Sequence, residues 1–193
     1  MRPLEETIAV LSAKLLALDP GPLAELRRME LDGVGASMFW RLVATLELPA
    51  EQTREWMQIV RILAILTPKS SLNASLRLHD RSVRLGRILC DGGNPAWPSD
   101  PQKPRPQLSE QRLARLLVTP LSQRGEALER IARMLARSRS PEVGINCTEI
   151  ALLLLDPSNP LSLQDVARYY YARLDYAGRD SNKTQETMEG TAA

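Results

Sequence analysis

The side chains in this sequence that are best suited to chemistry are arginines at helical spacing. Arg130, Arg133 and Arg137 follow an i, i+3, i+7 pattern, so a helix would present all three on one face. Similar spacings relate the pairs Arg54 and Arg61, Arg84 and Arg87, and Arg112 and Arg115. A guanidinium group binds phosphate oxygens through paired hydrogen bonds and also stacks on bases. Several such ridges side by side would form a groove for a phosphate backbone.

The same arginines also have a purely structural interpretation. Arginine is a good helix former, and the solvent-facing side of a helix needs polar residues. Glu126 and Arg130, like Glu129 and Arg133, are spaced for i, i+4 ion pairs that would neutralise part of the charge. Few aromatic residues accompany the ridges, which argues against reading bases by stacking. We therefore expect backbone contacts without sequence preference, with structural ion pairs as the alternative.

No catalytic constellation accompanies the arginines. His79 is the single histidine, so zinc sites and triads that need a second one cannot form, and we expect a surface or hydrogen-bonded residue. Gly33-Val34-Gly35 is too short for a phosphate loop. Cys90 and Cys147 match no metal spacing and are expected to be free core thiols in a reducing cytoplasm. We expect a protein that is not an enzyme and uses no metal or cofactor.

The elements that would position the arginines are helices. Leu, Ala and Ile dominate the apolar residues, there is one Phe, and no segment alternates with period two. Apolar spacing predicts helices at about 4–18, 22–28, 37–43, 49–66, 81–89, 109–117, 120–137 and 162–176. Ser140-Pro141-Glu142 predicts a further helix start, because it places an N-cap, a first-turn proline and a first-turn acid in succession.

Proline content suggests how these helices divide. Five of the fourteen prolines fall within residues 94–107, which predicts a surface loop or linker. We predict an all-α protein of two small helical bundles, over residues 1–93 and 108–177, joined by this Pro-rich loop. Residues 178–193 are polar and aperiodic and are expected to be disordered. No apolar run approaches the roughly 18–20 residues of a membrane span, and no signal-peptide pattern is present, so we expect a cytoplasmic protein without a membrane partner.

The net charge of +2 hides a strongly basic middle segment. Residues 54–140 carry a net charge of +9, whereas residues 1–53 carry −3 and residues 141–193 carry −4. Arginine supplies 21 of the 25 basic side chains. A helical protein that concentrates positive charge in one segment is suited to a polyanionic partner such as nucleic acid.

Five short motifs follow one another between about residues 20 and 176. They are Leu23–Arg28 (xLRR), Phe39–Val43, Val83–Leu89 (LGxxL), Leu108–Leu117 (LSExRxxxLL) and Val166–Tyr170. In their order, and in the length of the chain, they resemble the CasB family, the small subunit of type I-E CRISPR surveillance complexes (Cascade). The last motif departs from the family pattern WARxYY, because Val replaces the aromatic residue.

The resemblance implies an all-helical, non-catalytic subunit of an antiviral ribonucleoprotein complex. Two copies would lie along the belly of the complex and stabilise the R-loop, in which the guide RNA pairs with target DNA and the non-target strand is displaced. Its implied partners are the backbone, large and crRNA-end subunits, the crRNA, the target DNA, the displaced strand and a second copy of itself. Exchange of a DNA duplex for an RNA–DNA hybrid is nearly balanced in free energy, so modest protein contacts can shift it.

The resemblance also extends the set of candidate binding residues. It covers Arg87, Arg112, Arg115 and Arg133 and adds Arg28 and Arg41. The complete set of candidate nucleic-acid-binding residues is Arg28, Arg41, Arg54, Arg61, Arg84, Arg87, Arg112, Arg115, Arg133 and Arg137. For Arg41, Arg87 and Arg112, structural ion pairs are an equally weighted alternative.

Two other classes of function stay open at this point. A helical regulator that reads duplex sequence would need a helix-turn-helix, and residues 109–137 contain two predicted helices joined near Thr119-Pro120. A pure protein–protein scaffold would bury its arginines in interfaces and bind no DNA at any salt concentration.

Overall fold

The computed structural model describes residues 2–68, 76–100 and 103–189, with side chains described as far as Ala177. Within these residues, regular structure is helical apart from an isolated bridge between His79 and Ile145. The helices are α1 (Leu4–Leu16), α2 (Pro20–Arg28), α3 (Ser37–Leu46), the 3-10 turn η1 (Ala50–Gln52), α4 (Thr53–Leu66), α5 (Leu85–Asp91), α6 (Glu110–Leu117), α7 (Leu121–Ser138), α8 (Cys147–Leu155) and α9 (Pro160–Glu189). The predicted all-α class is confirmed.

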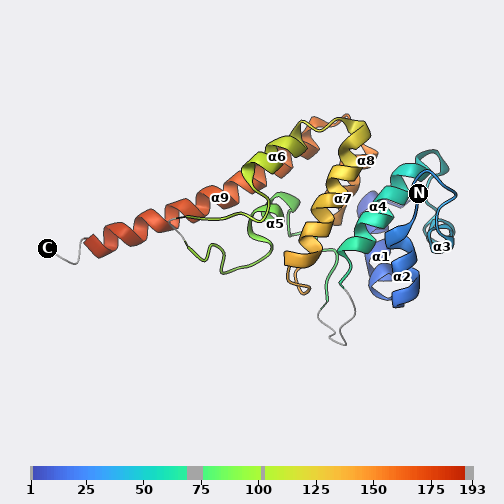
Figure 1. The fold of residues 1–193 in the computed structure, drawn as a ribbon, viewed down its shortest axis with the longest axis horizontal. Helices are drawn as coiled ribbons and strands as arrows, with labels where there is room; N and C mark the ends of the chain where they lie inside the picture. The colour runs from blue at the N-terminus through green and yellow to red at the C-terminus, as the bar shows by residue number, and fades with distance from the viewer. Residues whose placement is uncertain (1, 69–75, 101–102, 190–193) are drawn as a thin grey trace.

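Helix α4 occupies the centre of the larger group of helices (Figure 1). It packs against α2, α7 and α8, and α1 also lies on α8. The stretch from Ile62 to Leu66 is buried at every position, so α4 is apolar on nearly all sides where neighbours meet it. The predicted end of this helix at Thr67-Pro68 is confirmed, because α4 stops at Leu66 with Thr67 as its C-cap.

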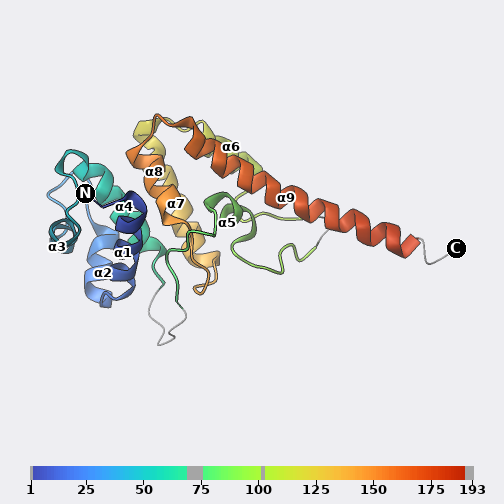
Figure 2. The same cartoon turned by 180° about the vertical axis from the view of Figure 1, so that it is seen from behind.

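A second group of helices forms around α9. Helix α5 packs closely on α9, and α6 lies beside it. The closest crossing is at Gly86, where a Cβ atom would collide with the backbone of Val166 and Tyr170. The close approach of α5 and α9 therefore requires glycine at position 86. Seen from behind, α9 runs away from the other helices towards the C-terminus (Figure 2).

The predicted arrangement of two successive bundles is not confirmed, because the two groups of helices mix both halves of the chain. Helix α5 precedes the Pro-rich loop but packs on α9, whereas α7 and α8 follow the loop but pack on α4 and α1. A single cluster of buried apolar side chains includes residues from both groups. Hydrophobic burial thus pairs helices that are distant in sequence, which a division at a proline-rich segment does not anticipate.

The Pro-rich loop, residues 94–107, is anchored to the helices. The Trp97 ring is buried, its Nε1 donates to the Arg105 carbonyl oxygen at 3.1 Å, and Arg173 of α9 donates to the Trp97 carbonyl oxygen at 2.8 Å. The chain then returns to the core, where the Leu108 N–H donates to the Leu89 carbonyl oxygen at 2.8 Å. The loop therefore lies on the surface as predicted, but its described part is tied down at both ends; residues 101–102 are outside the described part.

One predicted helix start is wrong. Ser140-Pro141-Glu142 does not begin a helix, and α8 starts only at Cys147. The intervening chain pairs with an earlier loop, since the Ile145 N–H donates to the Leu78 carbonyl oxygen at 2.9 Å. Asn146 then caps α8 by accepting a hydrogen bond from the Thr148 N–H at 3.2 Å. Tertiary pairing overrides the local capping signal here.

The last helix is longer than predicted at both ends. It begins at Pro160 rather than Ser162, and the Asn159 side chain accepts a hydrogen bond from the first-turn Leu161 N–H at 3.1 Å. Its backbone continues past Tyr176 to Glu189, so residues 178–189 are helical rather than disordered. No proline follows Pro160 to stop the helix. Residues 190–193 of the predicted tail lie outside the described residues.

The cysteines lie in the core and the histidine is hydrogen-bonded, as expected. Cys90 and Cys147 are buried and free, and burial raises the pKa of both thiols to about 12. His79 Nδ1 accepts a hydrogen bond from the Cys147 N–H at 3.2 Å, and partial burial lowers the pKa of the imidazole. Among the described helices, none combines the length and apolar character needed to cross a membrane.

Candidate nucleic-acid interface

Three of the predicted site arginines form ion pairs with carboxylates on other segments of the chain, and two of them, Arg61 and Arg84, join helices. Arg61 on α4 donates to the Met29 carbonyl oxygen at 3.1 Å and to Glu129 of α7 at 3.0 Å. Arg84, just before α5, pairs with Glu149 of α8 at 2.9 Å and stacks on the Tyr169 ring of α9 at 4.3 Å. Arg54 pairs with Asp32 on the loop after α2. Their charges are balanced by carboxylates within the protein.

Two further site arginines are paired along their own helices. Arg87 lies 3.2 Å from Asp91, a buried carboxylate that also binds Arg173 at 2.7 Å. Arg133 lies 2.6 Å from Glu129, which confirms one predicted i, i+4 pair, and Glu126 with Arg130 at 3.7 Å confirms the other. The structural alternative for Arg87 is therefore observed.

The remaining site arginines are exposed and pair with no acidic residue among those described. They are Arg28 on α2, Arg41 on α3, Arg112 and Arg115 on α6, and Arg137 on α7. The Arg28 Nε donates only to the Ala24 carbonyl oxygen of its own helix, at 3.3 Å. It lines a surface hollow that also contains Glu25 and Glu30. The structural alternative for Arg41 and Arg112 is not observed.

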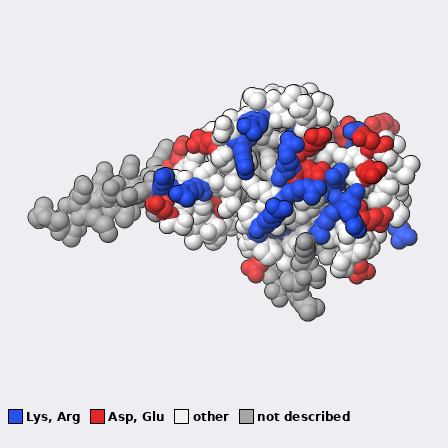
Figure 3. Space-filling view, viewed as in Figure 1, with Lys and Arg blue, Asp and Glu red and all other residues white. Residues whose placement is uncertain are grey.

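Helices α6 and α7 border an open hollow of about 360 Å³, which we call the α6–α7 hollow. Its rim carries Arg112 and Arg115 from α6 and Arg130 from α7, and none of the described residues that line it is acidic. Figure 3 shows that Lys and Arg side chains gather on this face of the molecule, over α6, α7 and α4. The geometry is suited to binding an anionic group, because all the charged side chains at the rim have one sign.

The amphipathic pattern of α6 directs these arginines outward. Leu113 and Leu116 are buried, so Arg112 and Arg115, each one position earlier, project to solvent. The Thr119 hydroxyl donates to the Arg115 carbonyl oxygen at 2.7 Å, where α6 ends. On α7, Arg137 extends the exposed ridge by two turns beyond Arg130.

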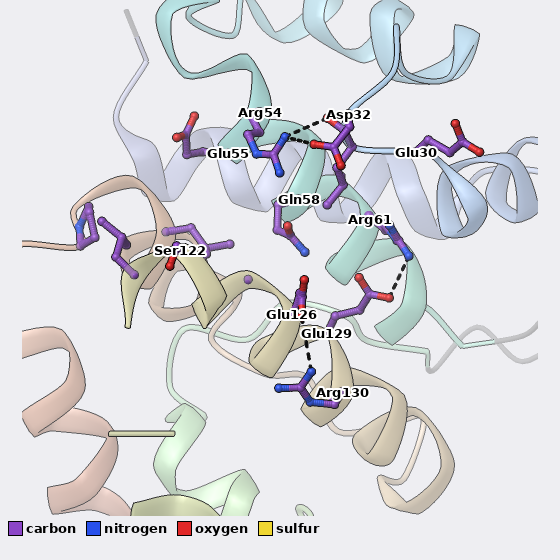
Figure 4. A pocket seen from close by; sticks show the side chains of 15 residues that line it. Glu30, Asp32, Arg54, Glu55, Gln58, Arg61, Ser122, Glu126, Glu129 and Arg130 are labelled. Carbon is purple, nitrogen blue, oxygen red and sulfur yellow. Dashed lines mark hydrogen bonds and ion pairs between the residues drawn. The ribbon is translucent and has the colours of Figure 1, made fainter. Parts of the chain in front are cut away.

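A second and larger hollow, of about 710 Å³, lies between α4 and α7 (Figure 4). We call it the α4–α7 hollow. It is also lined by three arginines, Arg54, Arg61 and Arg130, but five carboxylates accompany them: Glu30, Asp32, Glu55, Glu126 and Glu129. The helices approach closely here, since a Cβ atom at Gly125 would lie 2.7 Å from the Gln58 side chain. This hollow is acidic on balance, and the Arg61–Glu129 ion pair joins α4 to α7 across it.

Arg130 lines both hollows and links them into one surface. The sequence places it in the α7 ridge, but it is absent from the predicted site residues. Its pair with Glu126 is long, and the two side chains are 71% and 74% exposed, so the pairing neutralises it only weakly. The apolar floor beside it was likewise outside the predicted site. The signal for both is the run of helical positions 127, 130, 131 and 134 on one side of α7.

Metal binding and similarity to known proteins add no constraint. Within the described residues, no group of three His, Cys, Asp or Glu side chains is placed to hold a metal ion. The chain matches no protein-family model, no curated protein and no solved structure. The proposal for a function therefore rests on the geometry of the chain and on its sequence motifs.

Proposed function

We propose that this protein binds the backbone of nucleic acid without sequence preference, as the non-catalytic small subunit of a type I-E CRISPR Cascade complex. In that complex it would hold the displaced non-target strand beside the guide RNA–target DNA hybrid and so stabilise the R-loop. The observation that carries the binding function is the α6–α7 hollow, where three arginines from two helices surround an opening with no carboxylate.

Electrostatics favours this hollow as the binding surface. Arginines that are already paired must give up a carboxylate before they bind phosphate, whereas unpaired exposed arginines give up only water and counterions. Arg112, Arg115 and Arg137 are unpaired among the described residues, and Arg130 is only weakly paired. Binding through such groups needs no sequence information, which in a Cascade complex is supplied by the guide RNA.

The order of the five motifs supports the Cascade assignment. Two of these motifs lie in or beside the proposed binding surface. The LSExRxxxLL motif is α6 with its preceding cap, and its arginine is Arg112 on the rim of the α6–α7 hollow. The LGxxL motif lies in α5, where its glycine, Gly86, permits the close crossing with α9. One motif thus contributes to the proposed binding surface, and the other to the packing that supports it.

A sequence-reading regulator is the less favoured alternative. In a helix-turn-helix, two helices joined by a short turn pack together and the second enters the major groove. Here α6 lies on α9, while α7 packs on α4 and α8. A pure scaffold is disfavoured by the unpaired arginines around the α6–α7 hollow, and it predicts no binding to DNA.

The experiment is fluorescence anisotropy of the purified protein with unrelated single-stranded DNA over a salt series. Binding should weaken steeply with salt. The double variant Arg112→Gln/Arg115→Gln should reduce the slope of log affinity against log salt concentration by about 0.7 for each phosphate that the protein no longer neutralises. The matched control is Arg81→Gln/Arg168→Gln, which removes the same charge from exposed arginines paired with Glu5 and Asp165.

The control separates a local site from a general effect of net charge. Equal losses of affinity in both double variants would mean that net charge alone drives binding. If the wild-type protein binds no DNA at low salt, the proposed DNA binding of the free protein is wrong and the scaffold is favoured. A strong preference for one duplex sequence would favour the regulator.

A further inference from the structure

The floor of the α6–α7 hollow is apolar, which phosphate binding does not require. Leu108, Leu116 and Ala127 are buried beneath it, and Ile131 and Met134 are partly buried beside them. Leu108 is fixed from both sides, because its N–H donates to the Leu89 carbonyl oxygen and its own carbonyl oxygen accepts from the Tyr170 hydroxyl. The arginine rim thus surrounds a fixed hydrophobic surface.

We infer that this floor takes up one unstacked nucleobase while Arg112, Arg115 and Arg130 bind the phosphates next to it. The inference rests on the proposed function and deepens it, because it names single-stranded nucleic acid with an accessible base as the preferred ligand. The volume of about 360 Å³ is at the lower end of the range of about 300–1,000 Å³ typical of small-ligand sites. It therefore suits a single base rather than a stretch of duplex.

The combination of charges and apolar surface selects this occupant. A free inorganic anion would use the arginines but gain nothing from Ile131 and Met134, and an apolar peptide would leave the three guanidinium groups without partners. In duplex nucleic acid the bases are stacked and paired, so taking one out costs a few kcal/mol. A single strand offers both the phosphates and the base without that cost.

Recognition of this kind stays independent of sequence. The lining of the hollow offers few polar side chains besides the arginines, and the Thr119 hydroxyl is already donated to the Arg115 carbonyl oxygen. Every base has an apolar face that can lie on aliphatic side chains, as wedges of Leu, Ile and Met do in other nucleic-acid complexes. The floor should therefore add affinity and single-strand preference rather than base specificity.

The test compares three ligands of equal length, about twelve nucleotides: oligothymidine, an abasic strand with the same phosphates, and a duplex. With the wild-type protein, the abasic strand should bind at least about fivefold more weakly than oligothymidine, since base contacts are worth roughly 1–3 kcal/mol. Met134→Gln, which keeps length but makes the floor polar, should weaken oligothymidine binding and leave abasic binding unchanged. Val118→Gln alters a strongly exposed apolar residue outside the hollow and is the matched control.

The outcomes separate this inference from the proposed function. Equal affinity for oligothymidine and the abasic strand would overturn the base site while leaving backbone binding intact. Tighter binding to the duplex than to oligothymidine would also overturn it. Binding to none of the three ligands would instead remove the proposed function of the free protein and, with it, the inference. The ligand comparison uses the wild-type protein, so the result does not depend on the folding of a variant.

Discussion

The α6–α7 and α4–α7 hollows each contain three arginines and share Arg130, yet they have opposite electrostatic character. In the α4–α7 hollow five carboxylates outnumber the arginines, whereas no carboxylate is found among the described residues that line the α6–α7 hollow. The same residue type therefore serves two purposes within one surface. Where acids lie beside it, arginine joins helices; where they are missing, it leaves a positive field available for a ligand.

The difference is also one of burial. Arg61 and Glu129, which join α4 to α7, have side chains that are only 21% and 12% exposed, so their pairing is partly shielded from water. The arginines at the rim of the α6–α7 hollow are all exposed. A shielded pair contributes to stability only while both partners are present, whereas an exposed, unpaired charge can be removed without unfolding the protein.

Reversing the charge of one arginine in each hollow should give the largest difference in affinity for DNA between the two hollows. Arg115→Glu should weaken binding to single-stranded DNA by about tenfold at low salt, because it replaces an attraction to phosphate with a repulsion. Arg54→Glu should weaken it by less than about threefold, since Asp32 already balances that arginine. Anisotropy titrations at one low salt concentration compare the two variants directly.

These two variants also give the outcome that would break the comparison. Both residues are exposed, and each substitution changes the net charge by the same amount. Equal losses of affinity, or a larger loss for Arg54→Glu, would mean that the α4–α7 hollow takes part in binding and that internal carboxylates do not screen it.

The next largest effect is on the stability of the protein, which should respond differently when each of two glutamates of α7 is replaced. Glu129→Ala should lower the free energy of unfolding by about 1–3 kcal/mol, because it leaves Arg61 partly buried without its partner. Glu126→Ala should change it by less than about 0.5 kcal/mol, since the Glu126–Arg130 pair is long and exposed. Urea denaturation of both variants measures this, and a destabilised Glu126→Ala with an unaffected Glu129→Ala would contradict the assignment of roles.

The smallest expected effect has the opposite sign. Glu126→Gln removes the carboxylate beside Arg130, the arginine common to both hollows, and keeps the size of the side chain. Affinity for single-stranded DNA should rise by about twofold, which corresponds to the weak attraction of an exposed pair. Unchanged or lower affinity in the same anisotropy titration would indicate that Arg130 does not contact the ligand.

Local sequence patterns predicted the features that depend on near neighbours. The all-α class, the outward ridges of α6 and α7 and the two ion pairs along α7 all follow from helical periodicity. The features that the sequence patterns did not predict depend on tertiary contacts between residues far apart in the chain. The ion pairs of Arg61 with Glu129 and of Arg84 with Glu149 join residues that are 68 and 65 positions apart in the sequence.

The same limit explains two further differences from expectation. Ser140-Pro141-Glu142 carries sound local signals for a helix start, but the chain after it pairs with the loop at Leu78 instead. The α6–α7 hollow is lined by both α6 and α7, so the apolar positions 127, 131 and 134 along α7 do not by themselves indicate that a hollow lies beside them. A ridge of arginines is visible in a sequence, but the absence of carboxylates around it is not.

The most direct test of the central claim follows the arginine side chains themselves. Nε–Hε resonances of isotope-labelled protein can be recorded by NMR while single-stranded DNA is added. The account predicts that Arg112, Arg115 and Arg130, at the rim of the α6–α7 hollow, shift on binding. Arg61 and Arg84, held by carboxylates, should remain unchanged. Shifts at Arg54 and Arg61 with Arg112 and Arg115 unmoved would contradict it.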